Sequence, residues 1–163
     1  MIMKIFGIAG WSGSGKTTLI EKLIPLFVRE GLRVATIKHA HHNFDVDQPG
    51  KDSFRHRAAG AAEVMVVYSQ RWVLMHESRN EPEPDLQACL EKISPCDLIL
   101  VEGFKNEAIP KLEVYRAFNG KPPLFPGDPN VIAVASDDGI ATELPRFGLD
   151  QIEELVRFIG DYQ

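Results

Sequence analysis

The chain has 163 residues, which is enough for one domain with a substantial hydrophobic core. Its hydrophobic fraction of 44% and charged fraction of 25% are those of an ordinary globular protein, and its longest apolar stretches are far too short to span a membrane. The net charge of −5 argues against a large nucleic-acid-binding surface, so neither a nucleic acid nor a membrane is expected as a partner.

Strands and helices are predicted in alternation along the first part of the chain. Lys4 to Ala9 has the pattern of a buried strand, and the helix that begins near Lys16 carries apolar residues at helical spacing. We expect Pro25 to kink or shorten this helix, and Gly31 to end it. Arg33 to Ile37 is the second predicted strand.

The middle of the chain is predicted to contain shorter elements. A polar loop, Lys38 to Lys51, leads into a short helix near Asp52 to Ala62. Two short strands follow, Val64 to Tyr68 and Trp72 to Met75, close enough along the chain to form a hairpin. Asp85 is a candidate N-cap for a helix that carries apolar residues on one face.

The last part of the chain returns to buried strands. Leu98 to Val101 is a continuous apolar run, typical of a central parallel strand, and Leu112 to Tyr115 and Val131 to Ala135 are further strand candidates. The segment Gly120 to Pro129 is rich in glycine and proline and is predicted to be an exposed loop. The final helix is expected to begin near Asp150.

This alternation indicates an α/β fold of three layers with a mainly parallel central sheet, formed by a single domain over residues 1–163. Ligands of such sheets bind beyond the carboxyl ends of the strands. The polar residues that directly follow each predicted strand are therefore the candidate site residues.

A complete phosphate-binding loop follows the first predicted strand. Residues 10–17 read Gly-Trp-Ser-Gly-Ser-Gly-Lys-Thr, the GxxxxGK[ST] pattern, in the strand-to-helix context that the motif requires. Its glycines allow main-chain N–H groups to form an anion cradle, and the helix start adds further donors. An ordinary glycine-rich turn is the alternative, but such a turn has no evident use for the Lys-Thr pair. The loop predicts a site for a nucleoside triphosphate.

Three side chains of the loop have expected roles. Lys16 should reach the β- and γ-phosphates, the Thr17 hydroxyl should ligate Mg²⁺, and Thr18 is placed to bind a phosphate nearer the sugar. Glu102 follows a buried strand and is similar to the second acidic motif of nucleotidases with such a loop, which makes it the candidate Mg²⁺-side carboxylate. The alternative is a solvated glutamate at a strand end.

The polar loop after the second predicted strand contains three histidines and two aspartates: His39, His41, His42, Asp45 and Asp47. These residue types suggest a transition-metal site, but no cysteine joins them and the spacing fits no standard zinc pattern. We favour a loop that contacts substrate or nucleotide, because it follows a strand's carboxyl end. A metal site and a solvated loop are the alternatives. Arg55 and Arg57 follow and are expected on the surface.

One aspartate after the strand Val131 to Ala135 is a candidate for base recognition. Guanine presents an N1–H and an N2 amino group side by side, and one carboxylate can accept from both, whereas adenine has no such pair of donors. Asp137 is therefore a candidate guanine reader. An aspartate that caps a turn is an equally good reading of the same residue.

Taken together, several segments resemble one known family. The segments are GWSGSGKTTL, TIKHAHHNFDVDQPGKDS with the following AGA, RWVLM, DLILVEGFK and VIAVASD, in collinear order from about Lys4 to Asp137. The chain is similar to the molybdopterin-guanine dinucleotide biosynthesis adapter proteins, the MobB family. The phosphate loop alone is generic, whereas the histidine-rich segment and Val-Glu-Gly-Phe-Lys are much more specific.

The resemblance implies a P-loop fold, GTP binding with Mg²⁺, a homodimer, and weak GTP hydrolysis. It implies a role in molybdenum cofactor synthesis, in which the partner is the molybdenum cofactor guanylyltransferase that joins GMP to molybdopterin, with molybdopterin itself as a further candidate partner. Lys16 and Glu102 are assigned to catalysis, and Thr17 with Glu102 to Mg²⁺. The residues expected to bind the nucleotide are Gly10, Ser12, Gly13, Ser14, Gly15, Lys16, Thr17, Thr18, Lys38, His39, Asp52 and Asp137.

Two other functions are compatible with the same residues. One is a small-molecule kinase or ATP-dependent ligase that holds its acceptor with the histidine-rich loop and Lys51. The other is a GTPase that delivers a metal through the histidines.

No arginine finger or strong catalytic base is evident from the sequence, so slow hydrolysis of GTP is expected. Arg55 from a second copy of the chain is one hypothetical source of a finger.

The termini and cysteines bear on the cellular compartment. The N-terminus leads directly into a predicted strand and lacks a signal-peptide pattern. Cys89 and Cys96 have no paired zinc-ligand spacing and are expected to be buried or idle thiols. These features favour a cytoplasmic protein.

Overall fold

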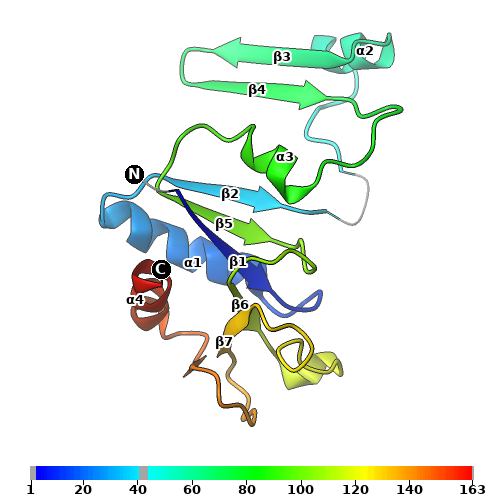
Figure 1. Ribbon diagram of the computed structural model, residues 1–163. Coiled ribbons are helices and arrows are strands. Elements are labelled where there is room, and N and C mark those ends of the chain that lie inside the picture. Colours follow the sequence, from blue (N-terminus) through cyan, green and yellow to red (C-terminus); the bar gives the residue numbers. More distant parts are fainter. Residues whose placement is uncertain (1–2, 41–43, 163) are drawn as a thin grey trace. The chain divides into compact units, whose positions relative to one another are not determined.

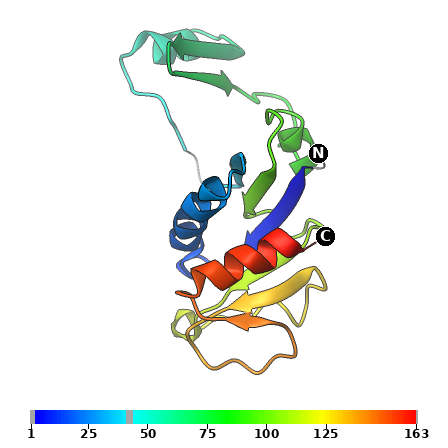
Figure 2. The same cartoon turned by 90° about the vertical axis from the view of Figure 1, so that its left-hand side faces the viewer.

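The computed structural model describes residues 3–40 and 44–162. The chain forms two compact units, unit 1 from Met1–His39 with Leu86–Gln163 and unit 2 from Ala40–Asp85. Figures 1 and 2 show the chain in two views related by a 90° turn. The single-domain organisation expected from the sequence stays a prediction.

Unit 1 is built on a six-stranded sheet with the strand order β2-β5-β1-β6-β7-β8. Neighbouring strands pair in parallel throughout the described part of this sheet, so the predicted α/β fold with a mainly parallel sheet is confirmed (Figure 1). The strands are β1 (Lys4–Ala9), β2 (Val34–Lys38), β5 (Leu98–Glu102), β6 (Lys111–Val114), β7 (Val131–Ala135) and β8 (Arg146–Phe147).

The strand order fixes where a ligand crevice can form. Strand β1 lies between β5 and β6, with β2 beyond β5 on one side and β7 and β8 beyond β6 on the other. The connection that leaves the carboxyl end of β1 therefore leads toward one edge of the sheet, to β2, and the connection that leaves β6 leads toward the other edge, to β7. In open α/β sheets, ligands bind outside the carboxyl ends at such a switch point. The crevice is expected between the ends of β1 and β6.

Helices α1 (Lys16–Arg29) and α4 (Ile152–Asp161) pack together on one face of the sheet (Figure 2). Helix α1 continues past Pro25 to its end at Arg29, so the proline does not shorten it. Gly31 has a φ of 86° directly after the helix, which confirms it as the predicted stop. The core side chains of these two helices are Leu19, Ile20, Leu23, Phe27, Leu155, Val156 and Ile159.

A second apolar cluster covers the opposite face of the sheet. Side chains alternate across a strand, and β5 divides accordingly, since Leu100 belongs to the first cluster and Ile99 to the second. Helix α3 (Leu86–Leu90) lies in this second layer, and Ile93 packs against the same cluster from beyond the end of the helix. Among the described residues, none of the helices combines the length and apolar composition that crossing a lipid bilayer requires.

Unit 2 contains helix α2 (Asp52–Ala58) and an antiparallel hairpin of β3 (Glu63–Tyr68) and β4 (Arg71–His76). The hairpin is the one predicted from the sequence, although α2 ends four residues earlier than predicted. Large apolar side chains are exposed along both strands: Met65, Val66, Val67, Tyr68, Trp72, Val73 and Leu74. A two-stranded hairpin has two faces, and consecutive exposed residues point to both of them.

The glycine- and proline-rich segment forms the predicted loop: six of the residues 120–129 are exposed and the other four are half-buried, with no helix or strand among them. A buried side chain of the sheet holds its middle. Glu113 is fully buried on β6, and its carboxylate accepts hydrogen bonds from the main-chain N–H groups of Leu124 and Phe125, at 2.8 and 2.9 Å. Burial raises the pKa of Glu113 above its ordinary value, partly offset by these two donors.

Candidate functional site

The phosphate-binding loop connects β1 to α1 in unit 1, as the sequence predicts. It begins at Gly10, directly after β1, and Gly15 is the N-cap residue of α1. Gly10, Gly13 and Gly15 have φ angles of 141°, 79° and 99°. Residues with a Cβ rarely adopt such positive angles. The three glycines therefore permit the main-chain turns that a cradle of inward-pointing N–H groups requires.

The polar side chains of the loop fit an anionic ligand. Ser14 is 1% exposed, and its Oγ has no hydrogen-bond partner within the described part of the chain. A buried hydroxyl without a partner costs free energy, and a ligand oxygen at this place would satisfy it. Ser12, Thr17 and Thr18 are exposed and accessible from solvent. The residues present thus match the acceptor-rich surface of a triphosphate.

The Lys16 ammonium lies over the loop itself. Its Nζ donates a hydrogen bond to the main-chain oxygen of Trp11 at 2.9 Å. Burial lowers the pKa of Lys16, the nearby Glu102 carboxylate offsets part of this shift, and the positive charges of Lys105 and Lys38 add to it. The side chain is therefore a partly desolvated cation that gains from an approaching anion.

Thr17 and Glu102 are brought together at the mouth of the loop. The Thr17 hydroxyl donates to the Glu102 carboxylate, with Oγ1 at 3.2 Å from Oε1 and 3.3 Å from Oε2. Glu102 is the last residue of β5 and pairs in register with Ile8 of β1. A hydroxyl and a carboxylate are oxygen ligands of the kind that Mg²⁺ prefers. The pair fits the predicted metal-side role, which stays a prediction.

Lys38 is the last residue of β2, paired in register with Glu102, and His39 directly follows it. The Lys38 ammonium lies 3.5 Å from Oε1 of Glu102, so it neighbours the Thr17 pair. The His39 ring stacks on Phe104, with 4.6 Å between ring centroids. Gly103 has a φ of 96°, and an added Cβ there would lie 2.7 Å from the His39 Cβ. The close approach that this glycine permits is therefore with His39.

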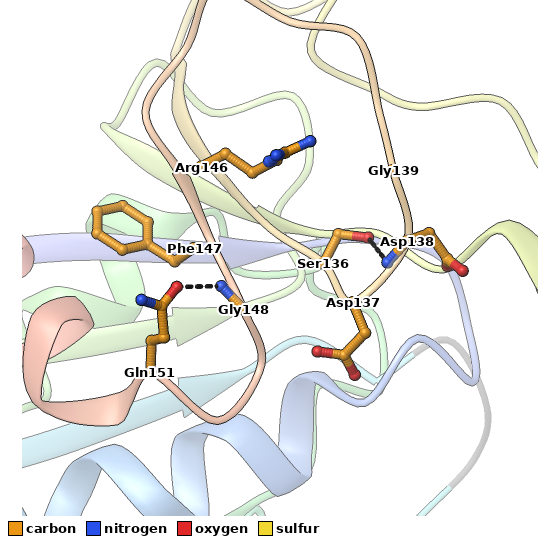
Figure 3. Close-up of a pocket in the computed structure, with 8 residues that line it drawn as sticks. All are labelled: Ser136, Asp137, Asp138, Gly139, Arg146, Phe147, Gly148 and Gln151. Atoms are coloured by element: carbon orange, nitrogen blue, oxygen red, sulfur yellow. Dashed lines mark hydrogen bonds between the residues drawn. The ribbon is translucent and has the colours of Figure 1, made fainter.

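An open pocket of about 310 Å³ lies beyond the carboxyl end of β7 and contains Asp137 (Figure 3). Asp137 Oδ1 accepts the Leu149 N–H at 3.0 Å, while the side chain as a whole is 58% exposed. One carboxylate oxygen thus stabilises the local turn, and the carboxylate remains accessible to a ligand. In Figure 3 the Asp137 carboxylate points away from the Arg146 side chain. The role of Asp137 in reading a base stays a prediction.

The remaining predicted residues belong to unit 2 or fall outside the described chain. Asp52 is exposed at the start of α2 and lies 3.6 Å from Arg55, and its role toward a nucleotide stays a prediction. His41 and His42 lie outside the described residues. Within the described residues there is no cluster of three or more histidine, cysteine, aspartate or glutamate side chains that could hold a metal.

Arg57 is a correction to the sequence-based prediction of a surface residue. Its side chain is only 15% exposed and forms ion pairs with Asp45 and Glu77, each at 2.7 Å, and with Asp47 at 3.2 Å. The hydrogen bonds to Asp45 and Glu77 are the main reason that the pKa of Arg57 is raised. The two aspartates that suggested a metal site in the histidine-rich loop are therefore engaged by a guanidinium.

Several basic residues lie near the loop; the sequence leaves Lys105 open as either a phosphate contact or a solvated lysine, and it does not single out Lys121 or Arg116. Lys105 Nζ lies 4.4 Å from the centroid of the Trp11 ring, and Lys121 Nζ lies 5.7 Å from it. Arg116 lies beside Gly15, with its Nε and Nη2 each 3.9 Å from where a Cβ on that glycine would be. Arg116 follows a strand's carboxyl end, so the criterion applied to Glu102 would have found it.

Comparison with known proteins agrees with this arrangement. The family model for molybdopterin guanine dinucleotide synthesis protein B, MobB, matches residues 5–137. The chain is 44% identical to a molybdopterin-guanine dinucleotide biosynthesis adapter protein of Escherichia coli, over 99% of this chain and 94% of the relative. It is 40% identical to the Haemophilus influenzae protein of the same description, over 97% of this chain and 88% of that one.

Solved structures give the same result at the level of the fold. The crystal structure of Bacillus subtilis MobB superposes with a TM-score of 0.75 at 26% identity, covering 96% of both chains. A MobB homologue from Bacillus stearothermophilus gives 0.72 at 27% identity, covering 98% of this chain and 97% of that one. The family does not favour the kinase or ligase alternative. With the resemblance seen in its motifs confirmed over nearly its whole length, the chain belongs to the MobB family of adapter proteins for molybdopterin-guanine dinucleotide biosynthesis.

Proposed function

We propose that this adapter binds GTP with Mg²⁺ on the loop from Gly10 to Thr18 and presents it during the attachment of GMP to molybdopterin. The observation that carries the proposal is the contact of the Thr17 hydroxyl with Glu102, at 3.2 Å, at the mouth of a complete phosphate loop. Generic anion binding needs only the loop, whereas the added hydroxyl and carboxylate suit a metal-bound triphosphate.

Different groups of the loop are proposed to bind different parts of the nucleotide. Main-chain N–H groups of the loop and the start of α1 hold phosphate oxygens. Lys16 adds a positive charge at the β/γ-phosphates, in exchange for its present bond to the Trp11 oxygen. Thr17 and Glu102 are the residues that would hold Mg²⁺, directly or through its waters. A bound Mg²⁺ supplies charge that neutralises the phosphates.

Hydrolysis of GTP by this chain alone is expected to be weak. Glu102 contacts the Thr17 hydroxyl and lies beside the Lys38 ammonium, so its charge is already shared between a donor and a cation. Neither interaction directs it toward an attacking water. Without a residue that firmly positions that water, P-loop proteins hydrolyse slowly.

The proposal includes partners and a location. The two exposed apolar faces of the β3–β4 hairpin support a homodimer, because apolar areas of this kind are typical of subunit interfaces. The molybdenum cofactor guanylyltransferase is the proposed partner enzyme, with molybdopterin as a candidate ligand, since relatives are described as adapters of that synthesis. The low cysteine content of the chain, two residues, favours the cytoplasm.

A calorimetric titration with GTP and ATP, each with and without Mg²⁺, tests the core of the proposal. We expect GTP binding that strengthens with Mg²⁺ and is lost in Lys16→Ala, while the thermal unfolding temperature stays near that of the parent protein. The matched control Lys92→Ala alters an exposed lysine outside the site and should bind normally. GTP affinity unchanged in Lys16→Ala would contradict the proposal.

Base selectivity is tested separately with Asp137→Asn. The substitution keeps the size of the side chain but replaces one accepting oxygen by an amide that donates, so the preference for GTP over ATP should fall by at least tenfold. If the ratio of the two affinities does not move, another residue reads the base. Repeated phosphorylation of an added small molecule would instead support the kinase alternative.

A further inference from the structure

Arg116 occupies the expected ligand crevice. It lies two residues beyond the end of β6, and β6 is the direct neighbour of β1, which carries the phosphate loop. Its Nε and Nη2 are each 3.9 Å from the position of a Cβ on Gly15, so the guanidinium lies against the loop at the start of α1. The same Nη2 lies 4.0 Å from Oδ2 of Asp137. The side chain therefore lies between the loop and the base-side pocket.

The guanidinium is not satisfied by the protein. Its Nε is buried and has no hydrogen-bond partner within the described residues. The Asp137 contact is at the limit of an ion pair, and the Phe118 ring, with its centroid 5.9 Å from Cζ, supplies no oxygen acceptor. A buried donor without a partner costs free energy that an acceptor from a ligand would recover.

We propose that Arg116 is a nucleotide-binding residue whose guanidinium donates to a phosphate oxygen of the nucleotide on the loop. The proposal rests on the proposed function, since it requires a nucleotide at that loop. Arg116 acts as a second cation beside Lys16, with a planar fork of donors that matches two phosphate oxygens. Because it also neighbours Asp137, it links the phosphate-binding part of the crevice to the part assigned to the base.

A phosphate oxygen is favoured over the base by the geometry. Both Nε, the unsatisfied donor, and Nη2 lie at the same distance from the Gly15 Cβ position, so one edge of the fork faces the loop. That edge is the one that binds phosphate bidentately. Nη2 of this edge also lies 4.0 Å from Oδ2 of Asp137, so the guanidinium stays beside the part of the crevice assigned to the base while its fork faces the loop.

The test uses calorimetry with two probes in the presence of Mg²⁺, GTP and inorganic tripolyphosphate, which has the phosphates but no base. Arg116→Ala should weaken both by roughly tenfold or more, the loss expected for a charge-assisted hydrogen bond. Arg116→Lys keeps the charge and loses the fork, so it should lie between Arg116→Ala and the parent protein. The matched control is Arg29→Ala, an exposed arginine at the opposite end of α1, which should bind both probes within twofold of the parent.

The outcomes separate this inference from the function on which it rests. If the parent protein binds GTP and both Arg116 variants bind it equally well, Arg116 has no role and the inference is overturned. If GTP affinity falls but tripolyphosphate affinity does not, the guanidinium acts on the base, which also overturns it. If the parent binds neither probe, the proposed function fails together with the inference. Arg116→Lys preserves a decisive result should Arg116→Ala fold poorly.

Discussion

The two glycines Gly10 and Gly13 offer a test of how tightly the phosphate loop packs on β6. Both have positive φ angles, so alanine at either position suffers backbone strain. They differ in their surroundings, because a Cβ on Gly10 would lie 2.4 Å from the main-chain oxygen of Val114, whereas on Gly13 its nearest neighbour is the Asn119 Oδ1 at 3.7 Å. Gly13→Ala is therefore the matched control for Gly10→Ala.

The expected magnitudes follow from these distances. Strain at positive φ costs about 1–2 kcal/mol for a residue with a Cβ near the left-handed region, as at Gly13, and about 1–3 kcal/mol at the φ of 141° found at Gly10. Gly10→Ala must in addition displace a strand carbonyl by about 1 Å, an overpacking that typically costs about 1–3 kcal/mol. We expect the free energy of unfolding to fall by about 2–6 kcal/mol in Gly10→Ala, and by about 1–2 kcal/mol in Gly13→Ala.

Urea denaturation followed by tryptophan fluorescence measures this difference. The chain has two tryptophans, and Trp72 lies in unit 2, so a Trp72→Phe background leaves Trp11 of the loop as the reporter for unit 1. If the m-value is the same in all variants, a shift of the urea midpoint reports a change in the free energy of unfolding. If Gly10→Ala is no less stable than Gly13→Ala, the loop does not pack against the Val114 carbonyl as described.

Two further perturbations address charges outside the site. Lys111→Ala should lower the free energy of unfolding by about 3–5 kcal/mol in urea denaturation, because the 1% exposed Lys111 ammonium pairs with Asp128 at 2.7 Å. The double variant Lys111→Met with Asp128→Asn should recover most of that loss, and no recovery would argue against the pair as its cause. Hydrogen bonds to Glu63 and Glu81 raise the pKa of His76, so the hairpin should be most protected from hydrogen exchange below about pH 6.5. That protection should decline as pH rises through the raised pKa, and a His76→Gln variant that keeps the same pH dependence would refute the assignment.

Much of unit 1 could be predicted because its signals are local. The apolar run Val131–Ala135 matches β7 residue for residue, since a strand buried on both faces is apolar at every position. Thr17 and Glu102 were both assigned to the metal side, and their side chains lie 3.2 Å apart, because β1, which leads into the loop, and β5, which ends at Glu102, are parallel neighbours whose carboxyl ends meet at one edge. The apolar pattern of the sequence thus predicts the strand, and the phosphate-loop motif predicts the site residues.

The features that could not be predicted depend on contacts between distant segments. Arg116 directly follows the predicted strand Leu112 to Tyr115 and is a candidate by position, but its place beside the phosphate loop depends on the pairing of β6 with β1, and no local pattern encodes strand order. Arg57 has the pattern of an exposed helical residue, and its burial requires that acids from the preceding loop and from beyond β4 converge on it. Pro25 was expected to disturb α1, yet the packing of Leu23 and Phe27 against the sheet holds the helix together on both sides of it.

The pairing of β1 has a consequence for how the protein is made. Lys4 pairs with Leu98, and Gly7 pairs with Lys111. The strand that is synthesised first therefore cannot pair until the second half of the chain has been made. At about 5–20 residues per second, translation separates Lys4 from Leu98 by roughly 5–20 s. The hairpin of unit 2 pairs only within residues 63–76 and is complete before β5 is synthesised. An apolar segment from β1 is therefore exposed during synthesis and is a natural substrate for chaperones.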